Sequence, residues 1–313
     1  MRAVLHVHRN LIEYRDPLDR VCLELLLQVL TEVTASYPGF FGPQRDPKRS
    51  DPVPALLELT LEPQRAGGVA SNLWALMATA YSVRDRVSGD TWRVINAIRA
   101  RLEVMRQHDR SELGDVEGHL EELVTSLVAL AGLSQESMLR GQAWLFLDIG
   151  RRLERVRQIC RLLRASTTEV READLESLVL DAVLAATESA TAYRRAYQIS
   201  PSCEPAFALL LFDASNPRSL AFQLETLQGH LALLPGVATD GKQSEQMQLI
   251  GEALTRLHGV DQGTLSDVDG TGRRATLIAL LDGCDGLLRE TAEGLTREYF
   301  TDLGGARQLI GSG

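Results

Sequence analysis

The chain has 313 residues and a formal net charge of -9, and aromatic residues make up 5% of it. An acidic chain with few aromatic residues is poorly suited to following a phosphate backbone, so we expect no nucleic-acid partner. The N-terminal segment has polar residues throughout and lacks the apolar stretch of a signal peptide, and no uncharged apolar run approaches the length of a membrane span. We therefore expect a cytoplasmic protein with no membrane partner.

Four cysteines are widely spaced in the sequence, at Cys22, Cys160, Cys203 and Cys284. This spacing excludes the short CxxC patterns of metal knuckles and redox sites. We predict reduced, buried thiols, which suit a reducing compartment. A chain of this length can bury a core without a disulfide or metal, and we expect no cofactor.

Helical periodicity covers most of the chain. Residues 18–36 place Val21, Leu25, Val29 and Val33 four residues apart on one helical face. A stretch rich in Pro and Gly over 37–54 predicts a long surface loop. Further helices are predicted from Gly68 to about Val87 and over about 90–107, 112–131, 134–164, 170–199, 217–233, 242–258 and 272–299. Strand signals are almost absent, so the sequence predicts an all-α, multi-helix bundle.

Two segments of the chain are weakly similar to each other. Residues 62–70 align with 213–221, because in both a run of leucines leads to an acid, a turn and a helix start. This predicts a bundle made of two weakly similar halves. In the second copy, Asn216 suits an N-cap and Pro217 the first helical position. Asp213 and Arg218 are then available to contact each other or a ligand.

The predicted helix over 134–164 carries two different stripes. One is apolar except for Gln142, and it predicts the core-facing side: Met138, Gln142, Leu145, Ile149, Leu153, Val156, Cys160 and Leu163. The other gathers Arg140, Trp144, Asp148, Arg151 and Arg155, with Glu154 at its border. Seven arginines and two acids lie between residues 140 and 164 of this otherwise acidic chain.

The second stripe has two interpretations. A solvated face of ion pairs, each worth about 0.3 kcal/mol, is the simpler one. An indole among charges and an excess of guanidinium groups favour a site instead, because the planar guanidinium pairs well with carboxylate or phosphate. We therefore predict an arginine-lined site between helices, with Trp144 as a wall and with Asp148 and Glu154 orienting the arginines.

A second candidate site contains Arg84 and Asp85, at the end of one predicted helix and just before the next. The favourable interaction of cations with a helix C-terminus is the alternative explanation. The sequence lacks GxGxxG, GxxxxGK[ST], HExxH and GxSxG motifs. Nucleotide-binding loops, zinc protease sites and a nucleophile elbow are therefore unsupported.

Four separated segments together resemble the alpha-E domain, a bacterial helical family named for a Glu-Arg motif. The motif segment reads Trp144-x3-Asp148-x-Gly150-Arg151-x-Leu153-Glu154-Arg155. The others are residues 83–92, residues 138–140, and residues 213–224 followed by His230 and Leu231. The resemblance implies a single domain over 1–313. Because Arg2-Ala3 matches Arg164-Ala165, it also implies that a first motif helix is missing upstream. Leu18-Asp19-Arg20-Val21 is an alternative match to that helix.

Members of this family are often fused to, or encoded beside, a circularly permuted ATP-grasp protein, and transglutaminase-like proteins are frequent neighbours. The resemblance thus implies an accessory module, binding a ligand or partner, in a peptide- or amide-forming system. A small anionic or peptide ligand would fit the arginines. Two alternatives stay open. One is an enzyme acting on small amides with Asp148 or Glu154 as its base, and the other is a purely structural helical scaffold.

Overall fold

The computed structural model describes residues 2–13, 17–35, 40, 52–107, 113–235 and 244–300. Every regular element in these ranges is a helix, and strand-like pairing there is limited to an isolated bridge between Glu169 and Arg273. The all-α prediction is confirmed. The loop predicted over 37–54 lies mostly outside the described residues. The weak similarity of the two halves stays a prediction.

The first helices of the described chain are α1 (Arg2–Glu13), α2 (Pro17–Thr34), α3 (Val53–Leu61), α4 (Val69–Ser82), the single turn η1 (Arg84–Arg86), α5 (Gly89–Gln107) and α6 (Leu113–Glu136). The later ones are α7 (Gln142–Ser166), α8 (Ala173–Ala186), α9 (Ala190–Tyr197), α10 (Cys203–Phe207), the π-helical turn η2 (Ala208–Phe212), α11 (Leu220–Leu231), α12 (Glu245–Gly259), η3 (Gln262–Leu265) and α13 (Ala275–Tyr299).

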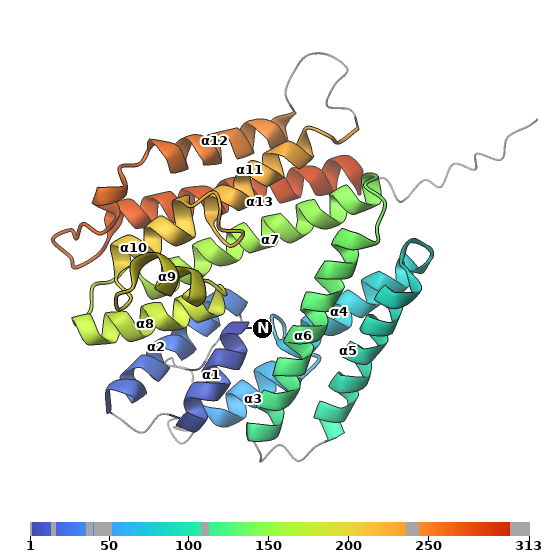
Figure 1. Ribbon diagram of the computed structural model, residues 1–313, viewed down its shortest axis with the longest axis horizontal. Coiled ribbons are helices and arrows are strands. Elements are labelled where there is room, and N and C mark those ends of the chain that lie inside the picture. Colours follow the sequence, from blue (N-terminus) through green and yellow to red (C-terminus); the bar gives the residue numbers. More distant parts are fainter. Residues whose placement is uncertain are drawn as a thin grey trace, which may run out of the picture.

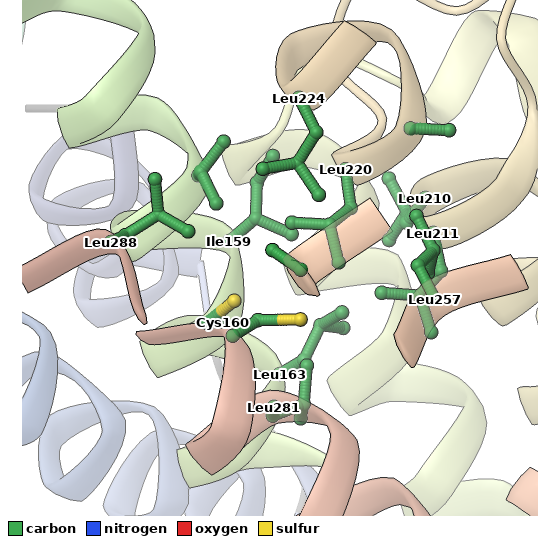
Figure 2. Close-up of a cluster of buried hydrophobic side chains, with 14 of the residues drawn as sticks. Ile159, Cys160, Leu163, Leu210, Leu211, Leu220, Leu224, Leu257, Leu281 and Leu288 are labelled. Carbon is green, nitrogen blue, oxygen red and sulfur yellow. The ribbon is translucent and has the colours of Figure 1, made fainter. Parts of the chain in front are cut away.

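The helices enclose two apolar cores. One is formed mainly by α1–α6 and the other mainly by α7–α13. Helices α7, α11, α12 and α13 run alongside one another in Figure 1, with α7 packed against both α11 and α13. Figure 2 shows side chains from these helices and η2 meeting in the second core, among them Cys160, Leu163 and Leu224. Each leucine buried there contributes about 1.5–3 kcal/mol.

Helix α7 presents the predicted apolar face, but it begins later than predicted. Its core residues are Leu145, Ile149, Leu153, Val156, Cys160 and Leu163, and all six are buried. Met138 and Gln142 do not belong to this face. Helix α6 continues to Glu136 and a turn follows, so Met138 precedes α7, and Gln142 is exposed at its start.

Two other predicted helices are also shorter or broken. The helix predicted over 170–199 is interrupted at residues 187–189, where Glu188 adopts a left-handed backbone with φ of 59°. The Ser189 N–H donates to the Leu184 carbonyl oxygen at 2.8 Å and the Glu188 N–H to that of Ala185 at 3.1 Å, the backbone pattern that ends a helix at a left-handed residue. The helix predicted over 217–233 begins at Leu220. Its N-cap is Ser219, whose Oγ accepts from the Phe222 N–H at 3.1 Å.

Candidate functional site

Asp148 is the centre of a buried polar cluster on α7, with 1% of its side chain exposed. Arg152, one turn later, donates from Nε to Oδ2 of Asp148 at 2.6 Å. Arg151 donates to Oδ1 of the same carboxylate, which also accepts from Nε2 of Gln135 at 3.1 Å. The i,i+3 and i,i+4 spacing on one helix brings both guanidinium groups to this carboxylate.

Helix α11 completes this cluster from the other side. Nη1 of Arg152 donates to Oε1 of Gln223 at 3.1 Å, and Gln223 donates in turn to the Pro217 carbonyl oxygen. Nδ1 of His230 lies 3.2 Å from Oδ2 of Asp148. The cluster therefore joins the end of α6, the first half of α7 and α11 through polar contacts.

Trp144 covers one side of the cluster. The Arg140 guanidinium carbon lies 4.2 Å from the centre of the Trp144 ring, and the His230 ring meets the indole edge-on at 5.1 Å. Arg140 also donates to the Gln135 carbonyl oxygen. The structure thus brings Arg140, Trp144, Asp148 and Arg151 together, as their shared stripe predicts.

The charges in this cluster hold Asp148 ionised. Burial alone would raise the pKa of Asp148, but the guanidinium groups of Arg152 and Arg151 outweigh it and lower that pKa. Burial lowers the pKa of His230 below 6.5, although Asp148 acts in the opposite direction. At neutral pH the pair therefore consists of a carboxylate and a neutral imidazole.

A cavity of about 690 Å³ lies beside the later part of α7. Its lining comes from α1, α2, α4, α6, α7 and the end of α8, from the turn before α4, and from residues that follow α8 and precede α11. Four arginines line it: Arg2, Arg155, Arg161 and Arg218. Much of the remaining lining is apolar, from Val4, Leu30, Val33, Leu73, Leu76, Leu127, Ile159 and Leu162.

Arg155 is the arginine of this cavity lining that forms no ion pair with the described residues, although the charge of Asp148 favours its protonated form. No carboxylate of the described residues lies within 4 Å of its guanidinium group. Partial burial, followed by the charges of Arg218, Arg151 and Arg152, lowers the pKa of Arg155 to about 10. It stays protonated at neutral pH, but its charge is poorly solvated and repelled by its neighbours.

The other three arginines have acidic neighbours. Oε1 of Glu188 accepts from Nη2 of Arg2 at 2.9 Å, and Oε2 of Glu188 accepts from Arg218. Nε of Arg161 lies 3.8 Å from Oδ1 of Asp285. These carboxylates leave Arg155 as the arginine of the described lining that has no carboxylate within 4 Å.

Glu154 lines the same cavity as Arg155, although the two residues do not pair with each other. Its carboxylate is 65% exposed and lies 3.7 Å from Nη1 of Arg157. The predicted stripe therefore divides. Arg140, Trp144, Asp148 and Arg151 form the buried cluster, whereas Glu154 and Arg155 face the cavity together with Arg218.

Asp213 and Asn216 serve the turn before α11, outside the cavity lining. Asp213 accepts from the backbone N–H and hydroxyl of Ser215, and these hydrogen bonds lower the pKa of its carboxyl. Asn216 is buried, and its Oδ1 accepts from the Arg218 N–H at 3.0 Å. The interpretation of Asn216 as the N-cap is wrong, because the turn continues to Ser219 before α11 begins.

Arg84 and Asp85 lie in neither the Asp148 cluster nor the cavity lining. They lie in η1, the turn between α4 and α5, where both side chains are exposed. Asp85 pairs with Arg86 at 3.0 Å, and the Arg84 guanidinium lies 5.1 Å from the centre of the Trp92 ring. Both side chains therefore have partners within or next to the turn, and neither contacts the Asp148 cluster or the cavity.

Sequence reasoning missed several important residues. Arg152 has a signal, since it follows Asp148 by four residues, but it falls beside the charged stripe and is 9% exposed. Arg2, Gln223 and Glu188 carry no local signal, because each reaches its partner across a long sequence separation. Among the described residues, no group of three His, Cys, Asp or Glu side chains could hold a metal ion.

Comparison with known proteins identifies the family. A model of the Alpha-E family, described as a predicted alpha-helical domain with a conserved ER motif, matches residues 1–300. This chain belongs to the Alpha-E family. Glu154 and Arg155 form a Glu-Arg sequence, which matches the two residue types that this motif names. In this Alpha-E domain the Glu-Arg sequence lies on the cavity, and Trp144 and Asp148 lie in the buried cluster.

Two curated relatives that match this Alpha-E domain are described as uncharacterised proteins. An uncharacterised protein of Mycobacterium tuberculosis and one of Mycobacterium bovis are each 32% identical to the chain over 318 residues. The match covers 99% of this chain and 35% of each relative, so the chain spans about a third of their length. No solved structure matches. In the part of the chain that the structure describes, no helix has both the length and the apolar character needed to cross a membrane.

Proposed function

We propose that this Alpha-E domain is a binding module whose arginine-lined cavity takes an anionic ligand. We further propose that it acts as an accessory module of an ATP-grasp-type peptide- or amide-forming system. The observation that carries the first part is Arg155, a partly buried guanidinium without a carboxylate partner among the described residues. The second part rests on the family resemblance and on the chemistry of an anion site.

An anion in the cavity would remove an electrostatic cost that the ligand-free domain carries. Burial and three neighbouring guanidinium groups disfavour the charged form of Arg155. A carboxylate or phosphate oxygen accepting from Arg155 would form a charge-assisted hydrogen bond worth about 1.5–3 kcal/mol. The cavity volume of about 690 Å³ lies within the range of small-molecule sites.

The geometry supports an enzymatic role less well. A general base needs a pKa near the working pH and a path to the substrate. Asp148 is buried, its pKa is lowered, and its oxygens accept from Gln135, Arg151 and Arg152. Glu154 does line the cavity, but it is mostly exposed beside two guanidinium groups, Arg155 and Arg157.

A scaffold role is favoured for the Asp148 cluster alone. Its paired charges lie on α7, and hydrogen bonds from Gln135 and to Gln223 join them to α6 and α11, an arrangement that fixes how helices pack. We therefore assign the two parts of the motif segment different tasks. The Asp148 cluster holds α7 against α6 and α11, and Arg155 binds the ligand.

Anion binding can be tested with succinate and inorganic phosphate as probes, by calorimetry and by thermal unfolding. The wild-type domain should bind and be stabilised, since a ligand that binds only the folded state raises its stability. Arg155→Ala should remove this effect and leave the helix content unchanged. Arg289→Ala is the matched control, because Arg289 is an exposed arginine on α13 outside the cavity lining. Equal binding by wild type and Arg155→Ala would refute the proposed site.

The accessory role needs a separate measurement. An ATP-grasp protein encoded beside an Alpha-E gene would be assayed for ATP-dependent amide formation, with and without this domain. Amide formation should increase with the wild-type domain and not with Arg155→Ala. An activity that is independent of the domain would contradict the accessory role, and would leave anion binding to be judged by calorimetry.

A further inference from the structure

The cavity combines Arg155, which has no carboxylate partner in the described part of the chain, with an extended apolar lining. Leu76 from α4 and Leu127 from α6 both line it and are only partly buried, so each has apolar surface available to a ligand. The deeper lining includes Leu73 and Ile159, which are buried in the domain. A fully hydrated anion such as phosphate would leave this apolar surface uncovered. A ligand that has an apolar body as well as an anionic end would cover it.

A single negative charge suits the arrangement best. Arg2 and Arg218 already share Glu188, and Arg161 lies near Asp285. Arg155 is left as the site for one carboxylate, which its planar donors can bind through two oxygens. A second anionic group on the ligand would have to displace a carboxylate of the protein.

Gln158 adds an amide-recognising group next to Arg155. It follows Arg155 by three residues on α7, so the two side chains are neighbours on the helix surface. Gln158 also lines the cavity, and its side-chain amide makes no hydrogen bond with the described residues. An amide group both donates and accepts, and it therefore matches a peptide bond of a ligand better than a hydrocarbon chain.

We propose that the ligand is a short apolar peptide, or an N-acylated apolar amino acid, held by its terminal carboxylate. Arg155 binds the carboxylate, Gln158 binds the adjacent amide, and Leu76 and Leu127 contact the apolar side chains. This assignment rests on the proposed anion-binding function, and it narrows the anionic ligand to one chemical class. It requires no chemical step in the cavity.

Four probes separate the elements of this proposal. N-acetyl-leucyl-leucine carries the carboxylate, the amides and the apolar side chains. Its C-terminal amide lacks the carboxylate, N-acetyl-glycyl-glycine lacks the side chains, and octanoate lacks the amides. Calorimetry should show N-acetyl-leucyl-leucine binding the wild-type domain about tenfold or more tightly than each of the other three, because each lacks one group that the cavity recognises.

Three variants assign each preference to a residue. Arg155→Ala should reduce the affinity for N-acetyl-leucyl-leucine to that of its C-terminal amide. Gln158→Ala should weaken the peptide about tenfold and leave octanoate unchanged. Leu127→Asn should reduce the preference for leucyl over glycyl peptide, and Val128→Asn on the same helix is its control, since Val128 is 53% exposed and outside the cavity lining. Circular dichroism of each variant verifies that it is folded.

The outcomes distinguish this inference from the function on which it rests. If N-acetyl-glycyl-glycine binds as tightly as the leucyl peptide, the peptide assignment is refuted while anion binding stands. The same conclusion follows if octanoate binds as tightly as the leucyl peptide and Gln158→Ala changes the affinity for neither of them. The peptide assignment is also refuted, and anion binding again stands, if succinate and phosphate bind but the leucyl peptide does not. If none of these anions binds wild type below about 10 mM, both proposals fail.

Discussion

Nδ1 of His230 lies 3.2 Å from Oδ2 of Asp148 in the polar cluster between α7 and α11. The contact holds a neutral imidazole against a carboxylate, because burial lowers the pKa of His230 and the positive charges of Arg152 and Arg151 lower it further. Protonation of His230 would add a third cation beside one carboxylate. Acid should therefore act on the stability of this domain through His230.

The sign of this effect follows from the lowered pKa. In the unfolded chain His230 takes up a proton near pH 6.5, and in the folded domain only at a lower pH. The unfolded state thus binds more protons just below pH 6.5, and stability falls as the pH falls, by at most about 1.4 kcal/mol per pH unit for this group.

Urea unfolding at pH 7.5 and pH 5.5 measures this loss of stability. His230→Gln should make the loss smaller, and His258→Gln, at an exposed histidine on α12, should not. An unchanged loss in His230→Gln would show that another group is responsible.

Removing the Asp148 carboxylate should strongly destabilise the domain. Asp148→Ala leaves the side chain of Arg152, itself 11% exposed, as a buried charge without its carboxylate. We expect a loss of about 3–5 kcal/mol in the free energy of unfolding, measured by urea denaturation. Asp85→Ala, which removes an exposed ion pair with Arg86, is the control and should change stability little. A loss below about 1 kcal/mol in Asp148→Ala would mean that the cluster relaxes or hydrates easily.

Gly68 closes the turn between α3 and α4, where the backbone leaves no room for a side chain. A Cβ atom there would lie 2.5 Å from the Leu59 carbonyl oxygen and 2.9 Å from that of Arg65. Gly68→Ala should therefore destabilise the domain by about 1–3 kcal/mol, because backbone must move. Gly132→Ala is the control, because Gly132 is exposed within α6 and a Cβ atom added there would meet nothing within 4 Å. That variant should gain about 0.5–1 kcal/mol. Equal thermal unfolding midpoints for the two variants would contradict this account.

The four cysteines should resist alkylation in the folded domain. All four are free and buried, as the sequence predicts. Burial raises the pKa of Cys203 to about 12 and that of Cys284 to about 11, and it raises the pKa of Cys160 well above its usual range. Thiolates, which are the reactive form, are therefore rare at neutral pH. Mass spectrometry after iodoacetamide treatment should find no labelling without denaturant and full labelling in urea. Rapid native labelling would indicate local opening of the core that contains the labelled cysteine, the first core for Cys22 and the second for the other three.

Predictions from local sequence were most accurate where one helix face meets one core. The spacing of Leu145, Ile149, Leu153 and Val156 specifies the buried face of α7, because burying apolar surface is favourable whichever partner covers it. Periodicity was less reliable at helix ends. It does not show that α7 begins after Gly141 or that α8 ends before Glu188, because turns depend on local hydrogen bonds that an apolar stripe does not record.

The candidate site was only partly predictable for the same reason. Asp148 and Arg151 share a helix face, so their contact follows from helical geometry. The contacts of His230 with Asp148, Gln223 with Arg152 and Arg2 with Glu188 join distant segments, and no single-helix pattern contains them.

The sequence by itself determined that this protein is helical, which faces of its helices are apolar, and that arginines concentrate on α7. These properties depend on backbone periodicity and on the cost of exposing apolar surface, which act locally along the chain. Only the tertiary structure decided which arginines would meet a carboxylate. Helix packing supplies Asp285 near Arg161 and Glu188 for Arg218, and it brings no carboxylate of the described residues to Arg155 at the cavity. Ion pairing requires atoms within a few ångströms, and only the assembled helices bring such atoms together.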